Sequence, residues 1–208
     1  MEERFETGTI GGWLHLPEDG NGDAILLTHG AGSDSNSALL VRLAEAFAEA
    51  GYVVLRYDLP FRHQKVKGPL TGAVSARDRE GVAEAMASVK KHVKGKVFAG
   101  GHSYGGRMTA MMAAERHGMA DGLVLLSYPL HPPKKPEQKR TTFFPEWKTP
   151  GLFVHGTKDP FGTIEELRES IALIPAATDV LVVEGAAHDL KRGADLAGEM
   201  LTRLRALV

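Results

Sequence analysis

A serine flanked by glycines is the residue in this sequence with the clearest potential for chemistry. Ser103 lies in the pentapeptide G-H-S-Y-G, after an apolar run that begins at Val97, and a helix-like stretch from Met108 to Arg116 follows. A strand, a G-x-S-x-G turn and a helix in this order are typical of a nucleophile elbow, which holds a serine at an exposed, strained tip. Chance alone gives such a pentapeptide in roughly one of ten chains of this composition. The hypothesis therefore needs an acid, a base and an oxyanion-binding loop elsewhere in the chain.

Activation of a serine hydroxyl needs a base to take its proton and an acid to orient that base. Asp159 follows the apolar segment Leu152–His155 through a glycine-containing turn, which would aim its carboxylate over the sheet edge. His188 follows the last apolar run, Val180–Val183, through small residues that could bring its imidazole to Ser103. A helix-capping or turn aspartate and a structural or surface histidine are the alternative interpretations. The order Ser, Asp, His along the chain favours a catalytic triad.

An oxyanion needs two backbone N–H donors, one from the residue after the nucleophile and one from an early strand–helix loop. Tyr104 would supply the first, aided by the positive end of the elbow helix. The segment T-H-G-A-G-S follows a buried strand and would supply the second from Ala31, or alternatively from Gly32. The residues that would support this loop are His29, Gly30 and Gly32. A phosphate-binding loop is the alternative, but the segment lacks the G-x-G-x-x-G spacing and the P-loop lysine.

Apolar segments of strand length alternate with helix-length segments, which is typical of a parallel sheet covered on both faces. The first two segments predict a hairpin at one edge, and six more predict parallel strands joined by helical crossovers. The predicted strands are Arg4–Thr7, Ile10–Leu16, Ala24–Thr28, Tyr52–Tyr57, the elbow strand from Val97, Gly122–Ser127, Leu152–His155 and Val180–Val183. The predicted helices begin near Ser37, Ser75, Met108, Ile164 and Asp195. The sequence thus predicts a three-layer α/β fold.

Two long loops would follow predicted strands, and the second of them breaks this alternation. Pro60–Thr71 is the first, and Pro129–Pro150, with six prolines, is the second. Ligands bind beyond the carboxyl ends of parallel strands, so the second loop either borders a site or is an irregular surface excursion. Basic side chains in both loops could attract an anionic substrate, although such charges are more often solvated surface. Arg107, one turn into the elbow helix, is expected to pair with a carboxylate.

The composition limits the class of protein. The chain has 208 residues, of which 43% are hydrophobic, and a formal net charge of −1. This length favours a single domain over residues 1–208, and the balanced charge gives no argument for nucleic-acid or membrane partners. The absence of cysteine excludes disulfides and thiolate catalysis. No apolar run approaches the length of a membrane span, and we expect a cytoplasmic protein.

Together these segments resemble the α/β-hydrolase superfamily over nearly the whole chain. The resemblance is closest to small members related to dienelactone hydrolases, and in particular to a compact subgroup that includes the hydrolase-like domain of a chromatin-complex subunit. It rests on the segments Thr28–Gly32, Ser127–Pro133, Lys135–Glu137 and His155–Gly162. It implies a mostly parallel sheet with helices on both faces, no large lid, and a triad of Ser103, Asp159 and His188. Dienelactone hydrolases have a cysteine where this chain has Ser103, so their particular substrate does not carry over.

We therefore expect a serine hydrolase of the carboxylesterase type that cleaves an ester or related acyl bond of a small-molecule substrate. We expect no metal ion or organic cofactor, and a monomer or small homo-oligomer. A silent hydrolase-like scaffold that binds a partner through residues 129–150 is one alternative. An acyltransferase or cofactor-free peroxidase on the same triad is another, because these enzymes differ in the nucleophile that reaches the acyl-enzyme. The sequence leaves the acyl group, the leaving group and the pathway open.

Overall fold

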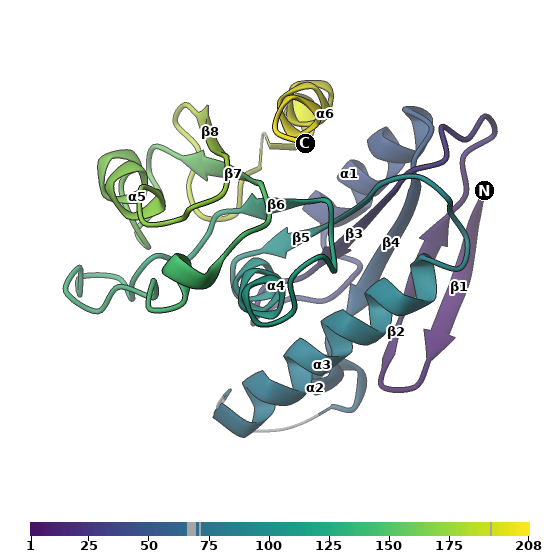
Figure 1. Ribbon diagram of the computed structural model, residues 1–208, viewed down its shortest axis with the longest axis horizontal. Helices are drawn as coiled ribbons and strands as arrows, with labels where there is room; N and C mark the ends of the chain where they lie inside the picture. The colour runs from purple at the N-terminus through teal and green to yellow at the C-terminus, as the bar shows by residue number, and fades with distance from the viewer. Residues whose placement is uncertain (66–69, 71, 192) are drawn as a thin grey trace.

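Eight strands form one sheet in the order β1-β2-β4-β3-β5-β6-β7-β8 (Figure 1). The computed structural model describes residues 1–65, 70, 72–191 and 193–208. The strands are β1 (Glu2–Thr7), β2 (Ile10–His15), β3 (Ala24–Thr28), β4 (Val53–Asp58), β5 (Val97–His102), β6 (Gly122–Leu126), β7 (Gly151–Gly156) and β8 (Thr178–Val183). The hairpin β1–β2 and the pair β2–β4 are antiparallel, and β3 to β8 are parallel. The predicted edge hairpin and six parallel strands are thus confirmed.

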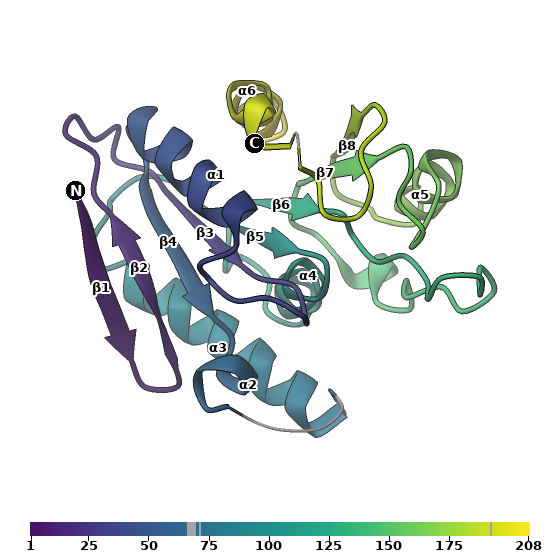
Figure 2. The ribbon, with the colours of Figure 1, turned by 180° about the vertical axis from the view of Figure 1, so that it is seen from behind.

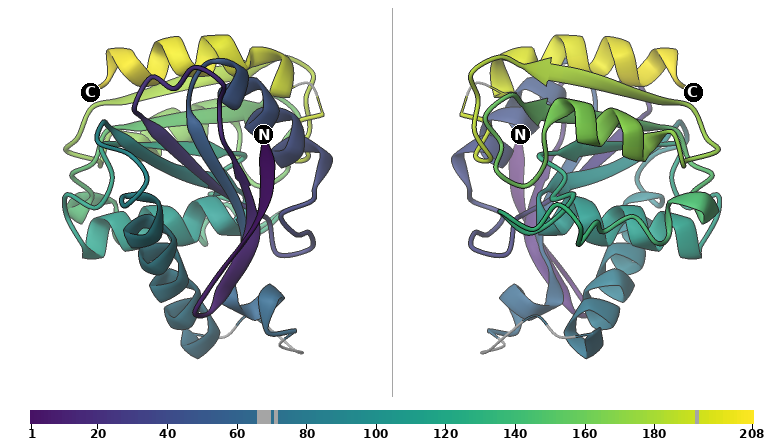
Figure 3. Two further views of the ribbon diagram at one scale, coloured as in Figure 1. Left: turned by 90° about the vertical axis from the view of Figure 1, so that its right-hand side faces the viewer. Right: turned by 90° about the vertical axis from the view of Figure 1, so that its left-hand side faces the viewer.

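Helices cover both faces of the sheet (Figures 1 and 3). One face carries α1 (Ala38–Glu49) and α6 (Ala197–Ala206), and the other carries α3 (Gly72–Val89), α4 (Tyr104–Glu115) and α5 (Ile164–Ile171). Successive residues of β3 alternate between these layers: Leu26 packs with α3 and α4, whereas Ile25 and Leu27 pack with α1. A strand buried on both faces must be apolar throughout. This requirement explains the continuous apolar runs in the sequence.

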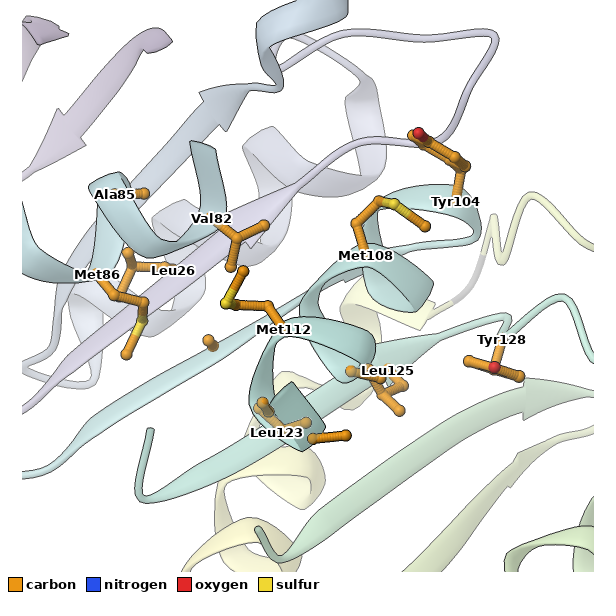
Figure 4. Packing of buried hydrophobic residues seen from close by; sticks show 14 of the residues in the cluster. Leu26, Val82, Ala85, Met86, Tyr104, Met108, Met112, Leu123, Leu125 and Tyr128 are labelled. Atoms are coloured by element: carbon orange, nitrogen blue, oxygen red, sulfur yellow. The ribbon is translucent and has the colours of Figure 1, made fainter. Parts of the chain in front are cut away.

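The helix α4 begins at Tyr104, directly after Ser103, and is buried between the sheet and α3 (Figure 4). Its methionines Met108 and Met112 are almost fully buried in the same cluster as Val82 of α3. Full burial of one such side chain contributes about 1.5–3 kcal/mol. This packing fixes the start of α4, and with it the position of Ser103.

Several element boundaries differ from the sequence prediction. The helix α4 starts at Tyr104, four residues before Met108. The sequence does not reveal this start, because the two glycines after Tyr104 have low helix propensity and are needed there for close packing. A Cβ on Gly106 would lie 2.6 Å from the carbonyl oxygen of Gly101. The short helix α2 (Pro60–His63) lies inside the first predicted loop, whose residues 66–69 and 71 are outside the described residues. A 3₁₀ helix, η2 (Gly193–Leu196), precedes α6, and α3 starts at Gly72 instead of Ser75.

The long segment between β6 and β7 contains only one turn of 3₁₀ helix, η1 (Phe144–Glu146). Its side chains Phe144 and Trp147 are fully buried against the sheet. This segment therefore packs onto the body of the protein, and the fold has no large lid. Figure 2 shows the same arrangement from behind. Among the described residues, no helix combines the length and apolarity needed to cross a membrane.

Replacing Gly105 by alanine is expected to destabilise the fold by about 3 kcal/mol. The new Cβ would lie 2.5 Å from the carbonyl oxygen of His29 and 2.7 Å from Cγ2 of Thr28, so α4 would have to move away from β3. Urea denaturation measures the change. Gly198→Ala is the matched control, because that position of α6 is open and helical, and this variant should gain up to about 1 kcal/mol. Equal stability of Gly105→Ala and the parent protein would contradict the prediction.

Candidate active site

Ser103 occupies a strained turn between β5 and α4. Its φ and ψ are 51° and −115°, in a region that costs a non-glycine residue about 1–3 kcal/mol. The turn is held because the N–H of Ser103 donates to the carbonyl of Leu126 on β6, at 2.8 Å. Gly101 permits it, since a Cβ there would lie 2.5 Å from the carbonyl oxygen of Thr28. The result is a partly exposed hydroxyl at the carboxyl edge of the sheet.

The structure brings Ser103, His188 and Asp159 into one hydrogen-bonded chain. The Nε2 of His188 lies 2.8 Å from the Oγ of Ser103, and its Nδ1 lies 2.8 Å and 3.1 Å from the two oxygens of Asp159. A carboxylate only accepts hydrogen bonds, so Nδ1 carries the proton and the lone pair of Nε2 faces the serine. This tautomer can accept the proton of the Ser103 hydroxyl.

Asp159 is held in its ionised form although its side chain is completely buried. Burial alone would raise the pKa of this carboxyl. The hydrogen bond with His188 and a second from the N–H of Phe161, at 2.9 Å, outweigh burial and lower the pKa below its usual value. The carboxylate can therefore stabilise a positive charge on His188.

Two aromatic rings that the sequence prediction missed enclose His188. The ring of Phe161 lies 4.2 Å from the imidazole, between centroids, and that of His102 lies 5.2 Å away. The Nε2 of His102 also lies 2.7 Å from the backbone carbonyl of His188, to which it donates. Nothing in the sequence indicates the role of Phe161, since its contact with His188 depends on how the β7–α5 loop folds. For His102, the sequence shows only that it precedes the nucleophile, and not that its ring packs against His188.

The loop after β3 lies directly beside the serine. A Cβ on Gly30 would lie 3.5 Å from the Cβ of Ser103 and 3.0 Å from the ring of His102, so only glycine fits there without displacement. The next residue, Ala31, is exposed in the turn, and its N–H has no acceptor within the described part of the chain. The N–H of Tyr104, at the first position of α4, has no partner in the helix. Both predicted donors are thus available at this edge.

His29 fixes the shape of this loop. Its Nε2 accepts a hydrogen bond from the N–H of Leu59, at 3.1 Å, and its Nδ1 donates to the carbonyl of Gly30, at 2.8 Å. The ring is fully buried, and burial lowers its pKa, so the neutral form is favoured. Gly32, the other supporting residue, is exposed in the turn.

A buried carboxylate, Asp78 of α3, connects the start of α4, which carries the N–H of Tyr104, to the segment that holds the Ala31 loop. Its Oδ2 accepts from the hydroxyl of Tyr104, at 2.7 Å, and its Oδ1 accepts from the N–H of Phe61, at 3.0 Å. The neighbouring Arg62 donates to the carbonyl of Ala31, at 2.9 Å. The positions of Tyr104 and of the Ala31 loop therefore depend on the same anchor.

Burial raises the pKa of Asp78, against the hydrogen bonds from Tyr104 and Phe61 that favour its charged form. The folded state then holds the proton more tightly than the unfolded state. The stability from this group is complete below about pH 3.9, the unfolded value, and is lost as pH rises through the folded pKa.

The variant Asp78→Asn does not titrate, so its free energy of unfolding relative to the parent protein should rise across this window. The expected rise is about 1.4 kcal/mol for each unit by which folding raises the pKa. Urea denaturation from pH 4 to pH 8 measures the difference. Parallel stability curves for the two proteins would contradict the prediction.

Other polar residues singled out from the sequence lie in different places. His155 is buried with its Nε2 3.9 Å from Asp159 and 2.8 Å from the carbonyl of Gly162, whereas His131 contacts Glu166. The expected ion pair of Arg107 was wrong: no carboxylate oxygen of the described residues lies within 4.0 Å of its guanidinium, and its buried Nε has no acceptor. No three His, Asp or Glu side chains in the described ranges gather closely enough to hold a metal ion.

An eight-stranded sheet of this order, with a serine at the turn between β5 and α4, defines an α/β-hydrolase fold. A family model described as an alpha/beta hydrolase domain matches residues 21–202. The chain therefore belongs to the alpha/beta hydrolase family.

Solved structures of similar fold cover almost the whole chain. A dienelactone hydrolase from Anabaena variabilis is 20% identical, with a TM-score of 0.76 and 98% of each chain covered. Est1E from Butyrivibrio proteoclasticus, with bound ferulic acid, is 17% identical, with a TM-score of 0.78 and coverage of 98% of this chain and 99% of that one. XC6422 from Xanthomonas campestris, a serine hydrolase without a lid, is 15% identical, with a TM-score of 0.74 and coverage of 99% and 94%. At these identities the similarity establishes the fold.

Proposed function

We propose that the protein is a serine hydrolase that cleaves an ester or related acyl bond of a small-molecule substrate. The observation that carries this proposal is the 2.8 Å contact between Ser103 Oγ and His188 Nε2, with Asp159 on the other ring nitrogen. Nucleophile, base and orienting acid in this geometry are the requirements for acyl transfer through a covalent intermediate.

In the first half of the reaction, Ser103 Oγ attacks the substrate carbonyl carbon while His188 Nε2 takes the hydroxyl proton. The carbonyl oxygen becomes an oxyanion, which the N–H groups of Tyr104 and Ala31 bind. Asp159 stabilises the imidazolium. His188 then returns the proton to the leaving alcohol as the bond to it breaks, and the acyl group remains on Ser103.

In the second half, water replaces the alcohol. His188 removes a proton from the water as its oxygen attacks the acyl carbon, and the tetrahedral intermediate again places its charge between the two N–H groups. The bond to Ser103 breaks, His188 returns the proton to Oγ, and a carboxylic acid leaves. Without a helical lid, the site suits short or polar acyl groups better than long lipids.

A fluorophosphonate probe tests the proposal directly, because it phosphonylates only serines that a base activates. Incubation should give one adduct, which peptide mass spectrometry should place on Ser103. A panel of 4-nitrophenyl esters of increasing acyl length should then show the fastest turnover for short chains. Absence of an adduct under conditions in which the protein is folded would instead favour a silent scaffold.

Product analysis separates hydrolysis from the two other reactions that the same triad could catalyse. The acyl-enzyme is offered water alone, water with an alcohol, or water with hydrogen peroxide. Free acid as the main product in all three supports a hydrolase. A new ester or a peracid as the main product would indicate an acyltransferase or a peroxidase.

A further inference from the structure

Arg107 lies one helical turn from the nucleophile. Its N–H donates to the carbonyl of Ser103, at 3.0 Å, which is the first hydrogen bond of α4. The side chain is partly exposed, while its Nε is buried without an acceptor among the residues that the structure describes. The side chain of Arg107 therefore leaves the first turn of α4, which starts directly after Ser103, and its Nε is an unused donor.

A second guanidinium, that of Arg140, is held nearby by the segment between β6 and β7. The N–H of Arg140 donates to the carbonyl of Leu130, at 2.7 Å, and its Nη1 donates to that of Pro129, at 3.2 Å. Its own carbonyl accepts from the hydroxyl of Tyr128, at 2.7 Å. Three contacts to the residues that follow β6 place this half-buried side chain beside the carboxyl edge of the sheet.

Neither of the two guanidinium groups pairs with a carboxylate of the described residues. Burial, and next the positive charge of Arg107, lower the pKa of Arg140. Within the described residues no Asp or Glu oxygen lies within 4.0 Å of either group. By contrast, Arg79 and Arg116 on the same side of the fold pair with Glu115 and Glu80. Two partly buried like charges without a counterion destabilise a protein unless an anion binds between them.

We propose that Arg107 and Arg140 form a subsite for a carboxylate of the substrate, next to the acylation site. The planar, forked guanidinium matches the two oxygens of a carboxylate, and the pairing is charge-assisted. The inference rests on the proposed hydrolase function and narrows its substrate to anionic esters with a short spacer between carboxylate and ester. The carboxylate belongs either to the acyl group or to the leaving alcohol.

Matched pairs of esters distinguish these two sources. The 4-nitrophenyl half ester of glutaric acid carries the charge on the acyl side, and 4-nitrophenyl valerate is its neutral counterpart. On the alcohol side, 4-acetoxybenzoate is compared with 4-acetoxybenzamide. We expect the parent protein to have the higher kcat/KM for the charged member of one pair.

Arg107→Met and Arg140→Met should each lower the ratio of kcat/KM for the charged ester to that for the neutral ester by about 10- to 100-fold, mainly through KM. Arg107→Lys should restore part of it, since it keeps the charge but not the fork. Arg116→Met removes the same charge from the other end of α4, where it pairs with Glu80 at the surface, and should leave the ratio unchanged. An equal loss on both esters, or the same shift in Arg116→Met, would overturn the subsite.

Binding of free glutarate separates failure of the subsite from failure of the proposed function. If no ester is cleaved and Ser103 takes no fluorophosphonate, the hydrolase proposal fails. Glutarate binding that is lost in Arg107→Met, followed by NMR titration, would still support the subsite. Equal binding by both proteins, or no binding by the parent protein, would refute it.

Discussion

Replacing Ser103 by alanine is expected to lower kcat for the best ester by about a million-fold, to the level left by substrate binding and the oxyanion donors alone. The Oγ atom, which lies 2.8 Å from His188 Nε2 on this strained turn, is the group that would bond covalently to the acyl carbon, and alanine has no atom that could replace it. Steady-state turnover and loss of fluorophosphonate labelling measure the effect.

Ser127 offers a control matched in backbone geometry. It follows the neighbouring strand β6, has a φ of 48°, and its buried Oγ has no partner in the described part of the chain. Ser127→Ala therefore places alanine at a similar strained position without removing the nucleophile, and turnover should remain near that of the parent protein. Comparable activity in Ser103→Ala and Ser127→Ala would refute the assignment of Ser103.

Asp159→Asn is expected to lower kcat by about 10,000-fold at neutral pH with little change in the fold. The Oδ1 of the new amide can still accept from the N–H of Phe161, which leaves its NH₂ group toward His188 Nδ1. An NH₂ group only donates, so Nδ1 must become the acceptor and the ring proton moves to Nε2. The lone pair that should receive the Ser103 proton is then lost.

Steady-state kinetics between pH 5 and pH 9 test this prediction, because the variant should remain slow over the whole range. Thermal unfolding shows whether the fold is retained. The neighbouring Asp189 is exposed and pairs with Lys191, at 3.4 Å, so Asp189→Asn controls for the loss of one negative charge. Turnover in Asp159→Asn within tenfold of the parent value would mean that this carboxylate does not orient the base.

Much of the fold follows from the sequence because its signals are local. Each buried strand must be apolar on both faces, and this requirement is visible in segments such as Ala24–Thr28. The proximity of Ser103, Asp159 and His188 could be predicted from their order along the chain. Each residue follows a parallel strand, and these strands end at the same edge of the sheet.

The remaining features depend on contacts between distant segments. Asp78 lies on a helix with no visible signal, and its role as anchor appears only when Tyr104 and Phe61 meet it. The isolated charge of Arg107 could not be predicted either. Whether a charge on a helix has a carboxylate partner is known only once all neighbouring side chains are placed. Local pattern thus predicts the strands, the order of the triad and the loop that contains His29, but not the anchor Asp78 or the unpaired Arg107.

The order of the site residues along the chain has a consequence for the newly made protein. Ser103 precedes His188 by 85 positions, and the proposed base follows β8, the last strand along the chain and an edge strand with a single neighbour. On the ribosome the nucleophile is therefore made long before the group that activates it. On the proposed mechanism, a nascent or truncated chain that lacks β8 would carry an unactivated hydroxyl at its elbow, and the serine would become reactive only in chains whose synthesis had passed His188.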